Sequence, residues 1–143
     1  MKIKLYAMMV LLLLVPKLAA GAEQLPALKV HHEANVSYVS GGIEPLERKA
    51  LAKMAERYQV QMTFSVDGSD EPVKGVKVTL IDYKGDKAVE TITEGPIFFA
   101  NPPPGRWILQ AELDGDKFSK QVDVNGRFYI SLPIHFKPAA KSN

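Results

Sequence analysis

The chain has 143 residues, with 18 lysines and arginines against 16 aspartates and glutamates, so its formal net charge is +2. A chain of this length holds one domain, and so small a charge excludes the strong attraction that nucleic-acid and anionic-membrane binding rely on. The sequence contains no cysteine, which excludes disulfide bonds, a thiol nucleophile and an acylated lipoprotein cysteine.

The first 22 residues have the pattern of a secretory signal peptide. Lys2 and Lys4 precede an apolar run over 5–15, and the small residues at 20–22 form a cleavage site. The run is shorter than the roughly 20 apolar residues that span a bilayer. Together with the cleavage site, this favours a cleaved signal peptide over the alternative, an uncleaved anchor. Cleavage would leave 15 basic against 16 acidic residues. We therefore expect an exported protein, periplasmic or secreted from a Gram-negative bacterium, with no membrane span after cleavage.

The mature chain is expected to begin with an arm, residues 23–42, followed by one amphipathic helix. The arm has little periodicity apart from a short candidate strand at 35–39. Pro45 suits a first helical position, where its missing N–H costs nothing, and apolar residues then recur at helical spacing as far as Tyr58. This stripe is expected to cover one side of a core and consists of Leu46, Ala50, Leu51, Met54, Ala55 and Tyr58.

After Tyr58 the apolar period changes from 3.6 to 2, which indicates β-strands. Asp114-Gly115 and Asn125-Gly126 predict tight hairpin turns. Because Pro133 donates no ladder hydrogen bond, the last strand is expected either to lie at a sheet edge or to end near this residue. Strands are predicted at 60–66, 76–80, 88–93, 97–100, 107–113, 118–124 and 128–136.

These strands predict the fold class. We expect antiparallel pairing throughout, because a parallel pair needs a crossover of about a dozen residues or more. Residues 43–137 should then form one mainly-β domain, an antiparallel β-sandwich of about seven strands with one N-terminal amphipathic helix. Residues 138–143 are expected to be a flexible tail.

Part of the strand pattern resembles a known family. The segments 75–80, 91–93, 98–99 and 103–109 (Pro-Pro-Gly-Arg-Trp-Ile-Leu), with a turn at Gly85, are similar to the carboxypeptidase regulatory-like domain. The resemblance implies a transthyretin-like, or prealbumin-like, sandwich of about seven strands. The preceding helix and strand resemble small uncharacterised secreted proteobacterial proteins, and this second resemblance carries no known activity.

The chain departs from the family pattern around its prolines, where Pro96 is inserted and Asn101-Pro102 replaces a leucine. We expect the structural difference from the family in this loop. The prolines that follow fix φ and favour an extended stretch, Gly105 permits a turn, and Trp107 is expected to enter the core. Two interpretations stay open, either core plus loop or an exposed partner-binding ridge made of Phe98, Phe99, Pro102, Pro103 and Pro104.

No catalytic or metal-binding set stands out in the sequence. The His-x-x-Glu zinc motif of the carboxypeptidases is missing, and the adjacent His31 and His32 would point to opposite faces of a strand. The serines lack the Gly-x-Ser-x-Gly elbow, and no phosphate-binding loop is present. Aspartates such as Asp82 gather in turns, where their side chains bind their own backbone. We expect no catalytic residues, no cofactor and no metal.

The sequence therefore favours a non-catalytic exported β-sandwich module that binds a protein or envelope polymer, or acts as a structural accessory. Its contacts would come from loops and edge strands, with strand addition as one mode. The alternative is a periplasmic small-ligand or carbohydrate-binding protein with a pocket between helix 45–58 and the sheet. An enzyme ranks third, and nucleic acid is not an expected partner.

Overall fold

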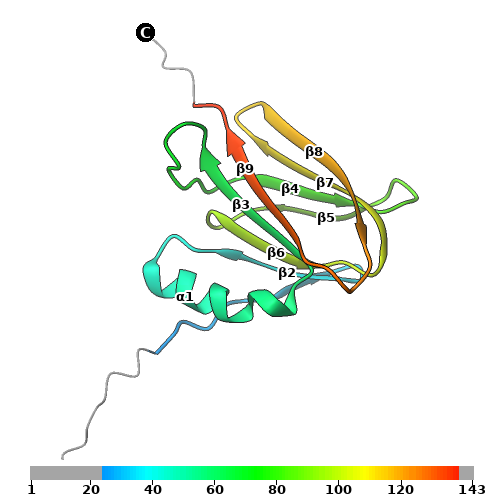
Figure 1. Ribbon diagram of the computed structural model, residues 1–143, viewed down its shortest axis with the longest axis horizontal. Coiled ribbons are helices and arrows are strands. Elements are labelled where there is room, and N and C mark those ends of the chain that lie inside the picture. The colour runs from blue at the N-terminus through cyan, green and yellow to red at the C-terminus, as the bar shows by residue number, and fades with distance from the viewer. Residues whose placement is uncertain (1–23, 139–143) are drawn as a thin grey trace, which may run out of the picture.

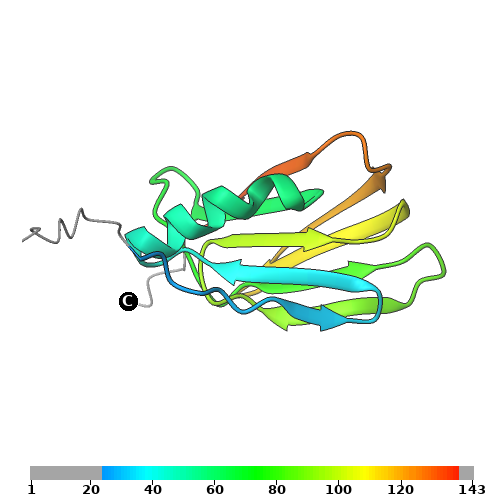
Figure 2. The same ribbon diagram turned by 90° about the horizontal axis from the view of Figure 1, so that it is seen from below.

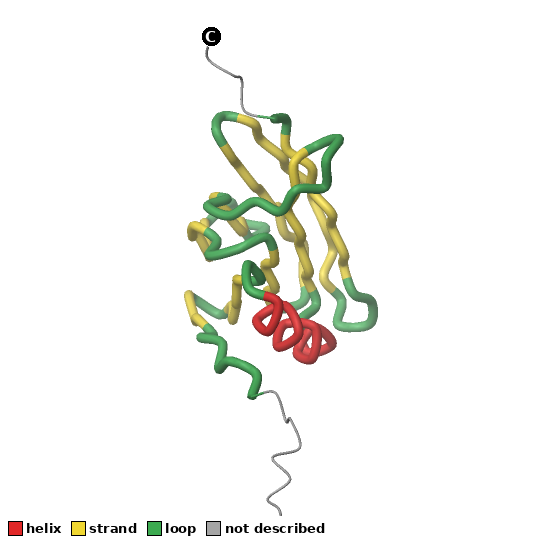
Figure 3. Tube along the Cα trace, turned by 90° about the vertical axis from the view of Figure 1, so that its left-hand side faces the viewer, coloured by secondary structure: helices red, strands yellow, loops and turns green. Residues whose placement is uncertain are grey.

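The computed structural model describes residues 24–138. The predicted signal peptide and residues 139–143 of the predicted tail lie outside this part. Within it, strands dominate and one short helix lies beside them (Figures 1 and 3). The elements are β1 (His31–Glu33), β2 (Val36–Gly41), α1 (Pro45–Met54), the 3₁₀ turn η1 (Ala55–Arg57), β3 (Val60–Val66), β4 (Lys77–Ile81), β5 (Lys87–Ile92), β6 (Ile97–Asn101), β7 (Gly105–Leu113), β8 (Asp116–Val124) and β9 (Ile130–Phe136).

The mainly-β prediction is confirmed, with two corrections. The described chain has nine strands rather than about seven, and α1 follows β2 instead of preceding every strand. The extra strands come from the range expected to be an arm. There β2 lies between β1 and β6, and Val36, Tyr38 and Val39 are buried. Of the described residues, 24–30 precede the first strand.

The strands form two sheets. One has five strands in the order β1-β2-β6-β3-β9, and the other has four in the order β5-β4-β7-β8. All neighbours are antiparallel except β3 and β9, which run parallel with Val60 opposite Ile130. Expecting antiparallel pairing throughout was wrong here, because the long segment 67–129 supplies the crossover that a parallel pair needs. Of the two outcomes expected from Pro133, the edge position is the one found, and β9 continues past the proline to Phe136.

A single hydrophobic core lies between the two sheets. Alternate residues of each strand point into it, as the period-2 pattern predicted, among them Phe64, Phe98 and Leu109. Trp107 also enters this core, and its Nε1–H donates to the carbonyl of Pro103 at 2.9 Å. The largest aromatic residue of β7 thus ties the core to the proline segment.

A second cluster holds α1 against the outer face of the five-stranded sheet, along β2 and β6 (Figure 2). Leu51 and Tyr58 from the helical region pack on Val39 and Phe99, and the Tyr58 and Phe99 rings stack at 5.9 Å. The predicted covering role of the helix is confirmed, except that Leu46 is 39% exposed. That residue lies in the first turn of α1, beyond the cluster.

Two predicted turns have different outcomes. Asp114 and Gly115 both have positive φ and join β7 to β8 as a tight hairpin, as predicted. Asn125-Gly126 was also expected to be a hairpin turn, and this is wrong, because β8 and β9 belong to different sheets. The loop crosses between sheets, so Phe128 precedes the strand and is 71% exposed instead of pointing inward.

Candidate functional site

The structure divides the predicted partner-binding ridge between the core and the surface. Phe98 is fully buried between the sheets, and Phe99 is 6% exposed beneath α1. The interpretation in which these two rings form part of an exposed ridge is therefore wrong. The core interpretation is confirmed for these two residues. Pro102 is buried and Pro103 is half-buried, whereas Pro104 is exposed at the start of β7.

Asn101, at the end of β6, links the proline segment to the end of the helical region. Its Oδ1 accepts a hydrogen bond from the Gln59 N–H at 3.0 Å, and its Nδ2 donates to the Arg57 carbonyl. Both partners of its side chain are backbone groups, one at the end of η1 and one just before β3. Asn101 therefore has a structural role and is not available to a ligand.

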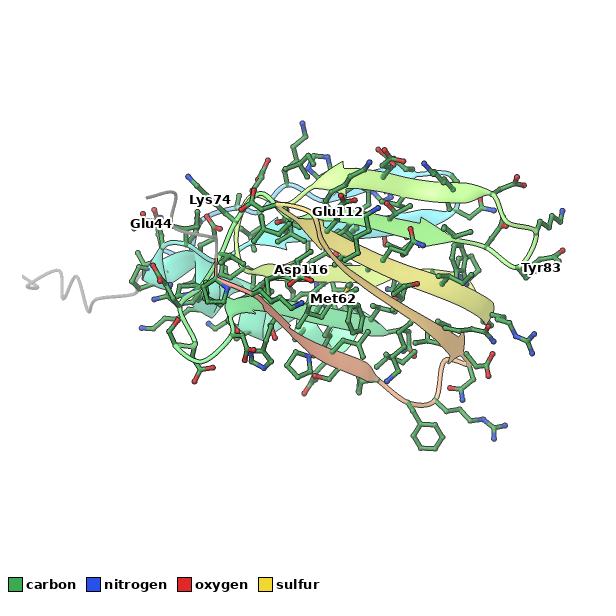
Figure 4. The ribbon with its side chains drawn as sticks, turned by 90° about the horizontal axis from the view of Figure 1, so that it is seen from above. Glu44, Met62, Lys74, Tyr83, Glu112 and Asp116 are labelled. Carbon is green, nitrogen blue, oxygen red and sulfur yellow. The ribbon has the colours of Figure 1, made fainter. Side chains whose placement is uncertain are left out.

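Exposed proline, aromatic and basic side chains meet at one end of the sheets. A hollow of about 270 Å³ lies between the β1–β2 turn, the β4–β5 turn and the proline segment. Tyr83, Pro104 and Arg106 line it, and the Tyr83 ring is 73% exposed. Figure 4 shows Tyr83 at the far tip of the β4–β5 turn, at the opposite end of the molecule from Glu44 and Lys74.

The β8–β9 loop borders the same end. Gly105 pairs with Val124, the last residue of β8, so the loop starts beside the proline segment. It presents Phe128, 71% exposed, next to the exposed Arg127. We call this combined region the loop-end surface, and define it as Tyr83, Lys84, Pro104, Arg106, Arg127 and Phe128.

Both turns that carry its aromatic residues are fixed by a side-chain oxygen. In the β4–β5 turn, Asp82 Oδ1 accepts hydrogen bonds from the N–H groups of Lys84 and Asp86, each at 2.9 Å. In the β8–β9 loop, Asn125 Oδ1 accepts from the N–H groups of Arg127 at 2.8 Å and Phe128 at 3.2 Å. The aromatic side chains are therefore presented on ordered backbone, which lowers the entropy lost on binding.

Charges on the loop-end surface are partly paired. The ammonium of Lys84 lies 5.6 Å from the centre of the Tyr83 ring, a cation–π arrangement. Arg106 faces Asp123 across the β7–β8 pair at 3.8 Å, and both side chains are well exposed. Because exposed pairs of this kind contribute only about 0–1 kcal/mol, Arg106 can exchange Asp123 for a partner's carboxylate at little cost.

The sheet edges, in contrast, carry features that hinder strand addition. The strand β1 has three residues, and β9 has Pro133 within it. In the edge strand β8, Lys120 lies opposite Leu109, in the row of residues that face the other sheet. A charged residue therefore stands on this edge. In β5, the Glu90 N–H points to a carboxylate oxygen of Glu33 at 3.4 Å. Short strands, proline and inward charges all discourage pairing with another chain.

The edge strand β5 also carries the clearest electrostatic feature of the chain. Glu90 lies 2.9 Å from Lys87 and 3.3 Å from Lys77. Hydrogen bonds first from Lys87 and then from Lys77 hold the pKa of the Glu90 carboxyl below its usual value. The group is fully exposed, so this arrangement is a surface ion-pair network, with no sign of a catalytic acid.

One serine–histidine pair arises that the sequence did not reveal. Ser65 Oγ and His135 Nδ1 lie 2.8 Å apart on the parallel strands β3 and β9. A nucleophile activated by histidine usually has a third group that orients the ring, and among residues 24–138 His135 has no such partner. The two residues are 70 apart in the sequence, and only the unforeseen parallel pairing joins them.

Of the other two histidines, His31 packs against a tyrosine. The His31 ring stacks on Tyr38 at 5.2 Å, and the Tyr38 hydroxyl donates to Glu33 Oε1 at 3.1 Å. Across the described residues, no three His, Cys, Asp or Glu side chains group closely enough to hold a metal ion. No helix within 24–138 is long and apolar enough to cross a membrane.

The pocket expected between helix and sheet is absent from the described structure, because Val39, Leu51, Tyr58 and Phe99 fill that space. Two open hollows lie at the end opposite the loop-end surface, one lined in part by Ile43 and the other by Leu46. The exposure of Tyr83 and Phe128 was not predicted from the sequence. The turn-forming Asp82 and Asn125 beside them were the available signal.

In comparisons with known proteins, the sequence matches no protein-family model and no curated protein.

Proposed function

We propose that this protein is a non-catalytic exported module, a prealbumin-like sandwich related to the carboxypeptidase regulatory-like domains, that binds a protein or envelope polymer through its loop-end surface. The observation that carries the proposal is the presence of two exposed aromatic side chains, Tyr83 and Phe128, at one end of the molecule. Each stands on a turn fixed by side-chain hydrogen bonds. Aromatic residues and arginine are the side chains enriched in binding hot spots.

The features of the sheet edges favour the loops, rather than the edge strands, as the site of contact with a partner. Lys120 and Pro133 stand on two edge strands, and β1 is too short to template a further strand. Strand addition, expected from sequence as one binding mode, is therefore not part of the proposal. The exposed Pro104 and Arg106 line the same hollow as Tyr83, and the loop that carries Phe128 starts after Val124, the partner of Gly105.

The proposal is tested by photo-crosslinking in intact cells. A photoreactive residue replaces Tyr83 in one variant and Phe128 in another, and the matched control carries it at Gln121, exposed on the outer face of β8. We expect adducts from positions 83 and 128 and none from 121. The partner identified by mass spectrometry should then bind the purified protein, and Phe128→Ala should weaken that binding by about tenfold or more.

Two results would overturn the proposal. One is equal labelling from all three positions, which is what random collisions produce. The other is a purified partner that binds Phe128→Ala and Tyr83→Ala as tightly as it binds the unaltered protein.

The alternative, a small-ligand or carbohydrate-binding protein, now rests on the hollow beside Tyr83 and Pro104. Its volume of about 270 Å³ lies below the range of roughly 300–1,000 Å³ usual for small-molecule sites. A thermal-shift series with sugars separates the two ideas, since a ligand that binds only the folded state raises the midpoint temperature. A rise that Tyr83→Ala abolishes would favour the alternative.

A further inference from the structure

We propose that Asn125 is a site of self-catalysed deamidation, in which the loop that presents Phe128 promotes its own conversion to aspartate and isoaspartate. The reaction is intramolecular and needs only water. It depends on three features of this loop: an accessible amide, a nitrogen free to attack it, and hydrogen-bond donors on the amide oxygen.

The attacking nitrogen belongs to Gly126. Both Asn125 and Gly126 are exposed, and glycine has no side chain to hinder the approach of its nitrogen to the preceding amide carbon. Among the described residues the Gly126 N–H donates no hydrogen bond, so no partner has to be given up. Adjacent residues also meet as an intramolecular pair, which removes most of the entropic barrier.

The donors are the backbone N–H groups of Arg127 and Phe128. They reach Asn125 Oδ1 at 2.8 and 3.2 Å. This is the oxygen that gains negative charge when the amide carbon becomes tetrahedral. Two preorganised N–H groups aimed at such an oxygen form the arrangement that stabilises acyl-transfer intermediates in enzymes. The same two hydrogen bonds fix the orientation of the Asn125 side chain.

The chemistry balances without a further reactant. The Gly126 nitrogen, deprotonated by solvent base, forms a bond to Asn125 Cγ, and the Cγ–Nδ2 bond breaks to release ammonia with the proton returned to it. The five-membered succinimide then adds water at either carbonyl carbon. Opening on one side gives aspartate, and opening on the other gives isoaspartate, whose backbone is one methylene longer.

The products would change the loop-end surface directly. Either product places a carboxylate near Arg127. The isoaspartyl form also lengthens the backbone three residues before Phe128. The presentation of Phe128 would then differ between young and aged molecules. This consequence follows for whatever partner the surface binds, so the site does not depend on the proposed function.

The test follows deamidation of the purified protein during incubation at pH 8 and 37 °C. Tryptic cleavage after Lys120 and Arg127 releases residues 121–127, in which the mass change and isoaspartate are measured. Asn35 is the internal control because the bulky Val36 follows it. We expect isoaspartate to form at Asn125 faster than at Asn35 by about tenfold or more, and Asn125→Gln to show none.

The contribution of the fold is measured by repeating the incubation in urea, where the hydrogen bonds to Asn125 Oδ1 are lost. The proposal requires the folded protein to react at least as fast as the unfolded chain. A slower reaction in the folded protein would mean that the turn protects the amide, which overturns the proposal. An unmodified Asn125 after prolonged incubation would overturn it equally.

Discussion

The burial of Phe98 and Phe99 can be tested against the interpretation that they form an exposed ridge. Phe99 is 6% exposed, stacks on Tyr58 at 5.9 Å and belongs to the cluster that holds α1 on the sheet. Phe98 is fully buried between the sheets. Replacing a buried phenylalanine by alanine costs about 3–5 kcal/mol, whereas surface substitutions stay within about 0.5 kcal/mol.

The assay is urea unfolding followed by the fluorescence of Trp107, the only tryptophan of the chain. With a slope of about 2 kcal/mol per molar, Phe98→Ala and Phe99→Ala should each lower the midpoint by about 1.5–2.5 M. Phe128→Ala is the matched control, with the same chemical change at an exposed site and a midpoint that should hardly move. Phe99→Leu, a milder change, covers the case in which the alanine variant fails to fold.

The reasoning would be refuted if Phe99→Ala left the midpoint unchanged while Phe128→Ala lowered it. Such a result would mean that α1 does not pack on β6 through this ring. If only Phe98→Ala lowered the unfolding midpoint, the core between the sheets would be supported. The packing of the second cluster around Phe99 would then be contradicted.

Three further predictions concern close packing, an edge strand and buried tyrosines. Gly95→Ala should cost about 1–3 kcal/mol in the same urea assay, because its Cβ would lie 2.4 Å from the Gly41 carbonyl; an unchanged midpoint would argue against this contact. Lys120→Val should increase self-association in light scattering, since it removes the charge from edge strand β8, and scattering equal to that of the unaltered protein would contradict this. Burial raises the pKa of Tyr38 and Tyr58 above 10.0, so the fold favours the neutral phenols, and stability should hold below pH 10 and fall as the pH rises further. Absorbance titration should show these two tyrosines ionising above pH 10, and midpoints at 10 would contradict it.

Much of the fold was predictable because it follows from local pattern. The period of 2 located β3 to β8, and Pro45 with the apolar stripe located α1. The parallel pairing of β3 with β9 was not predictable in this way. It joins segments far apart in the chain, and no local pattern states which strands become neighbours.

The surface was less predictable than the core. Phe98 and Phe128 are both aromatic residues in or next to an alternating run, and composition cannot separate them. Burial separates them, because the first belongs to a paired central strand and the second to a loop that crosses between sheets. The Asn125-Gly126 pair indicated a turn correctly, but its prediction as a hairpin assumed that consecutive strands share a sheet.

The exposed aromatic residues of the loop-end surface are not explained by folding stability. Single exposed apolar residues are common, and neither Tyr83 nor Phe128 would need a function if it stood alone. Both, however, occupy turns in which a side-chain oxygen, from Asp82 in one case and Asn125 in the other, already fixes the backbone. Any small polar residue would serve those turns as well and would avoid exposing a ring to water. Two turns that are far apart in the sequence each expose an aromatic ring at the same end of the sheets. A binding surface at this end would account for both rings.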